Sequence, residues 1–367
     1  MVTCVTNPSN VPERRTSLKA RIESRTLAPP AESPYVGLMR APASVIVITF
    51  AILALAAGCD KPTGSVRKAE SITPEGTPAL DLAAKPQILF QVFGDKEDAQ
   101  IIPLAAVVGG AIRPIGLTDA GWHELDRTFF ASGASFPLYR DDQEVGRATV
   151  SRGMWPTDSA PLYKLPGCSA VVPRASVKLT FDQQRTDPTI EFIASSEPLT
   201  SHPPFKGILA SGSDVMKMGR EFGHAVGKKA DMDAAELDAL DFHARQIVTG
   251  ATDAPTLLVS FVDPNAGDLG GGAGHTAHLF VLADKGAGGA YEPSYRHAAS
   301  GDAKTVEFQR LVDHLDVNGD GVDEIILEAW HYGADNDLVV LTFRNAQWHE
   351  VLRVKQSWCL DVKRAKD

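Results

Sequence analysis

The stretch HLDVNGDGVDEIIL (residues 314–327) places four carboxylates, one asparagine and two glycines between apolar residues. The segments around it, RLVDHL and EIILEAW, have the apolar, β-prone character of strands. Counted from Asp316, oxygen-bearing side chains occupy positions 1, 3 and 5, and a glycine occupies position 6. A hard cation requires this spacing in a tight loop. Because like charges this close repel one another, the sequence predicts two strands joined by a cation-binding turn.

This loop differs from an EF-hand. An EF-hand has a bidentate glutamate at position 12 and flanking helices, whereas position 12 here is Leu327 and the flanks predict strands. The loop resembles the shorter, strand-flanked calcium loops of the FG-GAP and VCBS repeat families, whose motif closes at position 9. The resemblance covers roughly residues 276–352, and because the loop occurs once it does not imply a whole propeller. It implies a structural calcium ion bound by Asp316, Asn318, Asp320, the Val322 carbonyl and Glu324, with Asp323 as the alternative to Glu324. The other interpretation is a metal-free acidic turn held by Asx-type hydrogen bonds.

A second informative stretch is VIVITFAILALAAGCD (residues 45–60). The 13 residues from Val45 to Ala57 carry no charge; they are too few to span a bilayer, which needs about 20 residues, but suit the apolar centre of a secretory signal. The segment ends in LAAGC, which resembles the lipobox of bacterial lipoproteins, with Ala56 where leucine is usual. The resemblance implies lipidation of Cys59 and a membrane-anchored protein of the bacterial cell envelope. A buried core helix is the alternative.

The segments around the apolar run complete this interpretation. Met39-Arg40 supplies the short basic start of a signal, so residues 39–58 are predicted to be the signal peptide. Residues 1–38 are polar and unpatterned, and we interpret them as a non-native N-terminal extension. Residues 59–85 are rich in Pro, Gly, Ser, Thr and charge, which predicts a flexible linker after the lipidated cysteine.

The body is predicted to be an α+β protein, mainly antiparallel sheet, with a helical segment between two β-rich parts. Residues 86–202 form the first β-rich region, with hairpins turning at Gly109-Gly110 and at 141–144 and a short helix over 118–130. Residues 203–255 form the helical segment, and 256–367 form the C-terminal β region with the calcium loop. Within the helical segment, helical spacing over 231–250 is carried by Leu237, Leu240, Ala244, Ile247 and Val248, ending at Gly250.

Charge and cysteine content restrict the partners and the chemistry. The net charge is −10 and residues 1–59 carry +3, so the remainder carries −13. An acidic body of this size repels phosphate backbones, so we do not expect a nucleic-acid partner. In an exported body Cys168 and Cys359 can form one disulfide; two buried free thiols are the alternative.

The sequence contains little that indicates catalysis. It has no nucleophile elbow, phosphate loop or zinc-protease helix. His275 and His278 follow a glycine run, but on a strand they would point to opposite faces. His297, His314 and His331 follow in the chain, so a histidine-rich zinc site is one interpretation, but no third ligand has diagnostic spacing, and exposed or packing histidines are the alternative. Exposed aromatic side chains would suit a peptide or glycan partner, although core packing is the simpler role for Trp155, Trp330 and Tyr332.

We therefore expect a binding or structural component of the envelope rather than an enzyme, with a protein or glycan as its partner. The alternative is an exported hydrolase with a carboxylate or histidine site in the C-terminal β region.

Overall fold

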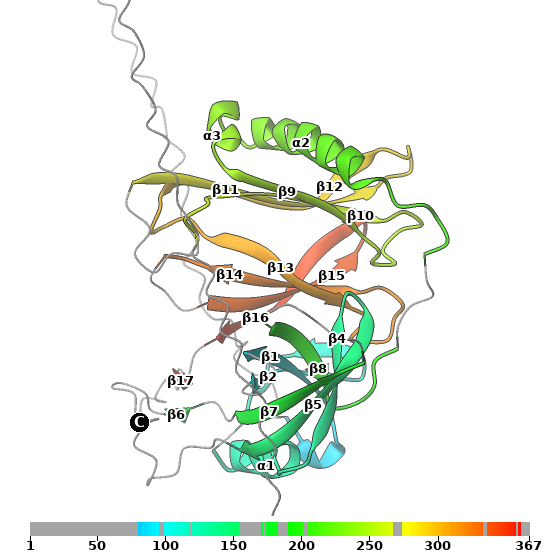
Figure 1. Cartoon of the computed structure of the whole chain (residues 1–367), viewed down its shortest axis with the longest axis vertical. Helices are drawn as coiled ribbons and strands as arrows, with labels where there is room; N and C mark the ends of the chain where they lie inside the picture. Colours follow the sequence, from blue (N-terminus) through cyan, green and yellow to red (C-terminus); the bar gives the residue numbers. More distant parts are fainter. Residues whose placement is uncertain are drawn as a thin grey trace, which may run out of the picture. The chain divides into compact units, whose positions relative to one another are not determined.

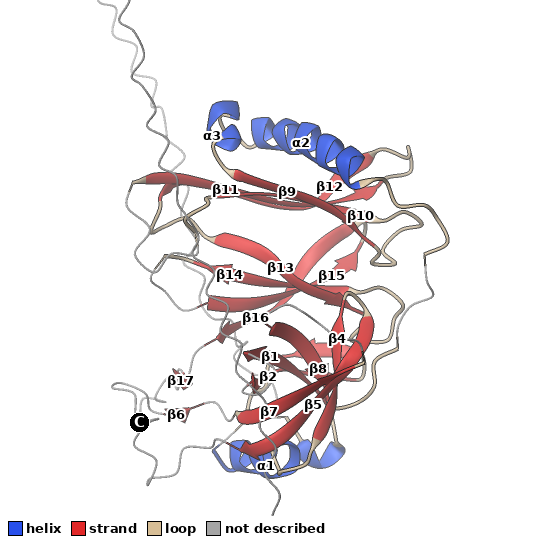
Figure 2. Cartoon of the chain, in the orientation of Figure 1, coloured by secondary structure: helices blue, strands red, loops and turns tan. Residues whose placement is uncertain are grey.

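The structure is a computed structural model. It describes residues 80–94, 99–117, 119–153, 170–171, 174–182, 190–200, 205–266, 274–332, 336–356 and 359–360. Residues 1–79, with the predicted signal peptide, Cys59 and most of the linker, lie outside this set, as do Cys168 and Trp155. The described residues are mostly antiparallel strands with few helices (Figure 2), so the predicted α+β class is confirmed.

The first part of the chain builds a seven-stranded antiparallel sheet in the order β1-β8-β4-β5-β7-β2-β3. Its strands are β1 (Gln87–Gly94), β2 (Ala99–Val108), β3 (Ala111–Arg113), β4 (Ser135–Arg140), β5 (Gln143–Gly153), β7 (Ala175–Phe181) and β8 (Ile190–Ser195). Since β1 also pairs with β2, six of these strands close into a barrel. The two hairpins predicted at Gly109-Gly110 and at 141–144 are β2–β3 and β4–β5.

The core of the barrel is rich in aromatic residues. One helix, α1 (Asp119–Phe129), packs against this core and lies where a helix was predicted. Trp122 and Leu125 of α1 are buried in the same apolar core as the inward faces of the strands. Phe90 lies at the centre of this core, with its ring centroid 4.9 Å from that of Phe136. The short helix η1 (Leu82–Ala84) precedes β1. The two-residue strands β6 (Ala170–Val171) and β17 (Cys359–Leu360) pair with each other.

The second part of the chain forms two four-stranded antiparallel meanders of identical connectivity. The first meander is β9 (Asp241–Ile247), β10 (Thr256–Val262), β11 (His275–Lys285) and β12 (Tyr291–Asp302). The second meander is β13 (Phe308–Leu315), β14 (Glu324–Trp330), β15 (Asn336–Arg344) and β16 (Gln347–Gln356). They pack face to face (Figure 1), because apolar side chains such as Phe280 and Leu282 of one meet Ile325, Val339 and Trp348 of the other in one core.

Both remaining faces of this sandwich are covered. The helices α2 (Gly212–Lys229) and α3 (Ala234–Asp238) lie on the outer face of the first meander (Figure 1). A Cβ at Gly219 would come within 2.5 Å of the Ala244 side chain, and one at Gly223 within 2.4 Å of Phe261. These glycines therefore allow α2 to approach the sheet closely. The outer face of the second meander shares a core with the barrel, where Leu89 and Ile193 meet Ile326 and Val340.

The helix predicted over 231–250 is wrong beyond Asp238, since α3 ends there and residues 241–247 form β9. Phe242 and Ala244 are two residues apart and both belong to the core under α2, which is a strand periodicity. The backbone of β9 pairs with β10, placing Ala244 opposite Val259. The apolar residues of this segment are compatible with the helical and with the strand period, because the segment is short. Backbone pairing with β10 decides in favour of the strand.

No helix within the described ranges is both long and apolar enough to cross a membrane.

Candidate functional site

The acidic loop lies between β13 and β14, so the two flanking strands expected from the sequence are present. The loop wraps around the carboxylate of Asp316, a residue that is only 3% exposed. This carboxylate accepts hydrogen bonds from the backbone N–H groups of Gly319 at 2.8 Å, Asp320 at 3.1 Å and Gly321 at 2.9 Å. Gly319 and Gly321 have φ values of 79° and 87°, which glycine adopts without strain.

Glu324, rather than Asp323, faces into the loop. It is 1% exposed, and its two carboxylate oxygens accept from the Asn318 side-chain amide at 2.5 Å and from the Val317 N–H at 3.1 Å. Burial raises the pKa of Glu324 to about 8, and the nearby charges of Asp320 and Asp316 act in the same direction. Burial also raises the pKa of Asp316. The loop therefore concentrates two desolvated carboxyl groups at positions 1 and 9 of the motif.

The residue types in the loop fit a hard cation, because carboxylate, amide and carbonyl oxygens are the ligands that calcium takes. The hydrogen bonds in the loop are those of Asx turns: Asn318 Oδ1 accepts from the Asp320 N–H, and Asp320 Oδ1 accepts from the Val322 N–H, at 2.8 and 2.9 Å. Among the described residues, no group of three His, Cys, Asp or Glu side chains is arranged to hold a metal ion. Asp316, Asn318, Asp320 and Glu324 are the side chains that would hold calcium, which stays a prediction.

Asp323, which directly precedes β14, faces His314 rather than the loop and is fully buried. Its Oδ2 lies 2.6 Å from Nδ1 of His314, which is itself 5% exposed. The Asp323 N–H donates to the Thr249 carbonyl at 2.8 Å, across to the turn between β9 and β10. His314 therefore contacts the residue next to a predicted ligand, a pairing that the sequence did not indicate.

The other predicted histidines divide between two places. His275 and His278 lie on opposite faces of β11, as the strand period predicts, so they do not form a zinc site together. His275 is exposed, and its Nε2 lies 2.7 Å from Glu236 Oε1 and 3.1 Å from Ser300 Oγ. A Ser-His-carboxylate relay uses both ring nitrogens, whereas here serine and glutamate meet the same nitrogen. This cluster is therefore a surface hydrogen-bond group rather than a catalytic triad.

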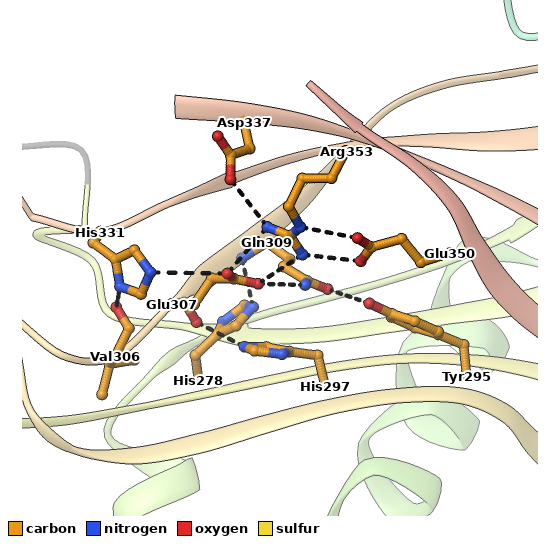
Figure 3. A network of polar contacts seen from close by, with 10 residues as sticks. All are labelled: His278, Tyr295, His297, Val306, Glu307, Gln309, His331, Asp337, Glu350 and Arg353. Atoms are coloured by element: carbon orange, nitrogen blue, oxygen red, sulfur yellow. Dashed lines mark hydrogen bonds and ion pairs between the residues drawn. The ribbon is translucent and has the colours of Figure 1, made fainter. Parts of the chain in front are cut away.

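His278 is enclosed between the two meanders (Figure 3). Its Nδ1 donates to the Phe261 carbonyl at 2.9 Å, and its Nε2 accepts from the Gln309 N–H at 2.9 Å. Burial, together with the neighbouring His297, lowers the pKa of His278 to about 3. The imidazole is therefore neutral at physiological pH, and both of its nitrogens are used to join strands.

Glu307, which precedes β13, connects His297 and His331 to a set of charged groups (Figure 3). Its carbonyl accepts from His297 Nε2 at 2.8 Å, and its carboxylate lies 3.8 Å from His331 Nε2. The carboxylate also lies 3.2 Å from Arg353. Burial acts to raise the pKa of Glu307, but the Arg353 charge and a hydrogen bond from Gln309 hold it below the ordinary value.

Arg353 of β16 is the cation at the centre of this network. Its guanidinium contacts Glu307 at 3.2 Å, Asp337 at 3.3 Å and Glu350 at 3.0 Å. The carboxylates come from the segment before β13, from β15 and from β16 itself, so the network joins that segment to β15 and β16. No sequence motif indicated this convergence, because the four residues are spread over 47 positions.

The aromatic residues near turns serve packing where they are described. Trp330 stacks on Phe308, with ring centroids 5.6 Å apart, and its Nε1 donates to the Ala266 carbonyl at 2.9 Å. The ring of Tyr332 meets Phe308 edge-on at 5.2 Å. These contacts support the core-packing role rather than an exposed platform for a glycan.

One cleft of about 350 Å³ lies between the start of β1 and the β2–β3 turn, lined by Lys85, Arg113 and neighbouring residues. None of the five predicted histidines lines it. The pairing of Cys168 with Cys359 is not described, because Cys168 lies outside the described residues and only the backbone of Cys359 is described. Comparisons with protein-family models, with curated proteins and with solved structures found no match.

Proposed function

We propose that this protein is a lipid-anchored component of the bacterial cell envelope, facing the periplasm or the exterior, that acts through binding or structure rather than catalysis. In this proposal Cys59 carries the lipid, and one calcium ion stabilises the loop between β13 and β14. The observation that supports it best is the burial of Glu324, at 1% exposed, beside Asn318 and against the loop that wraps Asp316. The partner is a protein or a glycan of the envelope.

Charge explains why a cation belongs in this loop. The groups that donate to the carboxylates of Asp316 and Glu324 are N–H groups of the loop and the hydroxyl of Thr342, which carry partial charges only. Two buried carboxyl groups with Asp320 nearby are costly to ionise together. Bound calcium supplies two positive charges at this point. It would join β13 to β14 and thereby strengthen the second meander.

The contacts of the histidines and carboxylates favour a structural role over the hydrolase alternative. His278 uses both ring nitrogens to hold backbone groups, and Glu307 is held by Arg353 and Gln309. A general base or nucleophile must instead be available to a substrate. These contacts therefore support a network that joins the sheets.

The calcium site is tested by calorimetric titration of the full chain in detergent after removal of divalent ions. We expect about one calcium ion per chain and a higher melting temperature in calcium. Asp320→Asn removes one ligand charge and should abolish both effects. Asp253→Asn changes an exposed aspartate in the equivalent turn between β9 and β10 and should leave both intact. Absence of calcium binding by the unsubstituted chain would overturn this part of the proposal.

The lipid anchor is tested separately by expression of the full chain in bacteria with a labelled fatty acid. The proposal predicts label on the protein and its recovery with membranes, both lost in Cys59→Ser. Retention of label or of membrane association in that variant would show that Cys59 is not the anchor.

A further inference from the structure

The calcium loop is packed against the turn that joins β9 to β10 in the other meander. The Asp323 N–H donates to the Thr249 carbonyl at 2.8 Å. A Cβ added to Gly250, whose φ is +73°, would come within 2.6 Å of the Gly321 carbonyl oxygen. The backbones of the two turns therefore touch at Gly250 and Gly321, and a shift of one must be accommodated by the other.

The end of β13, immediately before the loop, is also bonded to the barrel. The tip of the β4–β5 hairpin consists of Asp141 and Asp142, both with left-handed φ values of 50° and 58°. The Asp141 N–H donates to Asp313 Oδ1 at 2.8 Å, and the Asp142 N–H donates to the His314 carbonyl at 3.1 Å. Each backbone donor at this tip is therefore satisfied by a residue of β13.

His314 connects these two junctions. Its Nδ1 lies 2.6 Å from Asp323 Oδ2 on the loop side, and its Nε2 lies 3.8 Å from Asp141 Oδ1 on the hairpin side. The same Asp141 oxygen lies 3.8 Å from Arg245 of β9. Since His314 and Asp323 are both almost fully buried, their positions are fixed by packing. A continuous line of contacts thus runs from the calcium loop to the barrel hairpin.

We propose that His314 and Asp323 are positioning residues that couple calcium binding in the loop to the docking of the β4–β5 hairpin. This inference rests on the calcium site proposed above. Asp323 directly precedes the predicted ligand Glu324, so an ion that restrains Glu324 also restrains the partner of His314. Because coupling between two sites is reciprocal, a docked hairpin in turn favours calcium binding.

The test is amide hydrogen exchange of the full chain in detergent, with and without calcium. In the unsubstituted protein, we expect calcium to slow exchange within the loop and, by about five-fold or more, at the amides of Asp141 and Asp142. His314→Gln should keep slowed exchange in the loop but lose the calcium effect at the hairpin. His275→Gln, the same change at an exposed histidine of β11, should retain both effects.

The outcomes separate this inference from the calcium site itself. Calcium binding with protection of the loop, but unchanged exchange at Asp141 and Asp142, overturns the coupling and leaves the calcium site in place. Absence of calcium binding overturns both. The unsubstituted protein decides between these outcomes even if His314→Gln does not fold. Asp323→Asn, which keeps a side-chain oxygen to accept from His314, should retain part of the hairpin effect.

Discussion

The backbone N–H of Gln309 on β13 donates to Nε2 of His278 on β11 at 2.9 Å. The other ring nitrogen of His278 donates to the Phe261 carbonyl of β10. A single buried imidazole therefore joins a strand of the second meander to two strands of the first. Other polar contacts between the two sheets include those of Asp284 with Trp348 and of Tyr295 with Gln309, beside a shared apolar core.

The first prediction concerns this imidazole. His278→Ala leaves a buried N–H and a buried carbonyl without their partner and opens a cavity, so we expect a loss of about 2–4 kcal/mol in the free energy of unfolding. Urea denaturation followed by circular dichroism measures it. His275→Ala, on the same strand but exposed, should cost under about 1 kcal/mol. Equal losses in the two variants would contradict the structural role of His278.

The second prediction is a pH dependence. Since the pKa of His278 is lowered to about 3 in the folded protein, the unfolded chain, with an ordinary value of 6.5, binds a proton more readily. The stabilisation is therefore complete above pH 6.5 and is lost as the pH falls toward 3, at up to about 1.4 kcal/mol per pH unit. His278→Gln should show a shallower decline in the free energy of unfolding between pH 6 and 4 than the unsubstituted protein. His275→Gln serves as the control, and an unchanged slope in His278→Gln would refute the assignment.

The third prediction separates backbone strain from steric contact. Gly250 and Gly289 have nearly the same φ, +73° and +74°, but only a Cβ at Gly250 meets a neighbour, the Gly321 carbonyl. Gly289→Ala should cost about 1–2 kcal/mol for the left-handed conformation alone. Gly250→Ala should cost about 1–3 kcal/mol more, because the acidic loop between β13 and β14 must move. Denaturant titration of both variants checks this, and similar losses would show that the two turns are not in contact.

The fourth prediction concerns Asp284 of β11, which is buried between the sheets. Its carboxylate accepts from the Thr256 hydroxyl at 2.5 Å, the Ser294 hydroxyl at 2.5 Å and Trp348 Nε1 at 2.9 Å. Asp284→Asn replaces one acceptor oxygen by a donor that faces other donors, so we expect a loss of about 1–3 kcal/mol. Thermal and urea denaturation measure the change. Asp253→Asn, at an exposed turn, should be nearly neutral, and a neutral Asp284→Asn would count against these three hydrogen bonds.

Much of the fold followed from local pattern. Alternation of apolar residues predicted most strands, and the turns at Gly109-Gly110 and Asp141-Asp142 lie where glycine and aspartate tolerate left-handed backbone. The error over residues 241–247 has a definite cause. Leu240, Ala244 and Ile247 satisfy helical spacing, but the β10 backbone offers hydrogen bonds that a helix over these residues would forgo.

The candidate site was predictable only in part. Asp316, Asn318 and Asp320 lie within a stretch of five residues, so the ligand motif is visible in the sequence. The network around Arg353 is not visible in the sequence, because its carboxylates approach only after β13, β14, β15 and β16 have paired in order. The His314–Asp323 pair was hidden for a similar reason, since β13 and β14 must first align to bring the two side chains within 2.6 Å.

The sequence by itself determined the antiparallel α+β class, the acidic loop between two strands and the opposite faces of His275 and His278. These features depend on residues a few positions apart, whose relation is set by the period of the backbone. Only the tertiary structure decided the closure of the barrel through β1 and β2, the enclosure of His278 and the contact of Gly250 with Gly321. Those relations depend on which distant faces bury each other, and that choice is made by the packing of the whole chain.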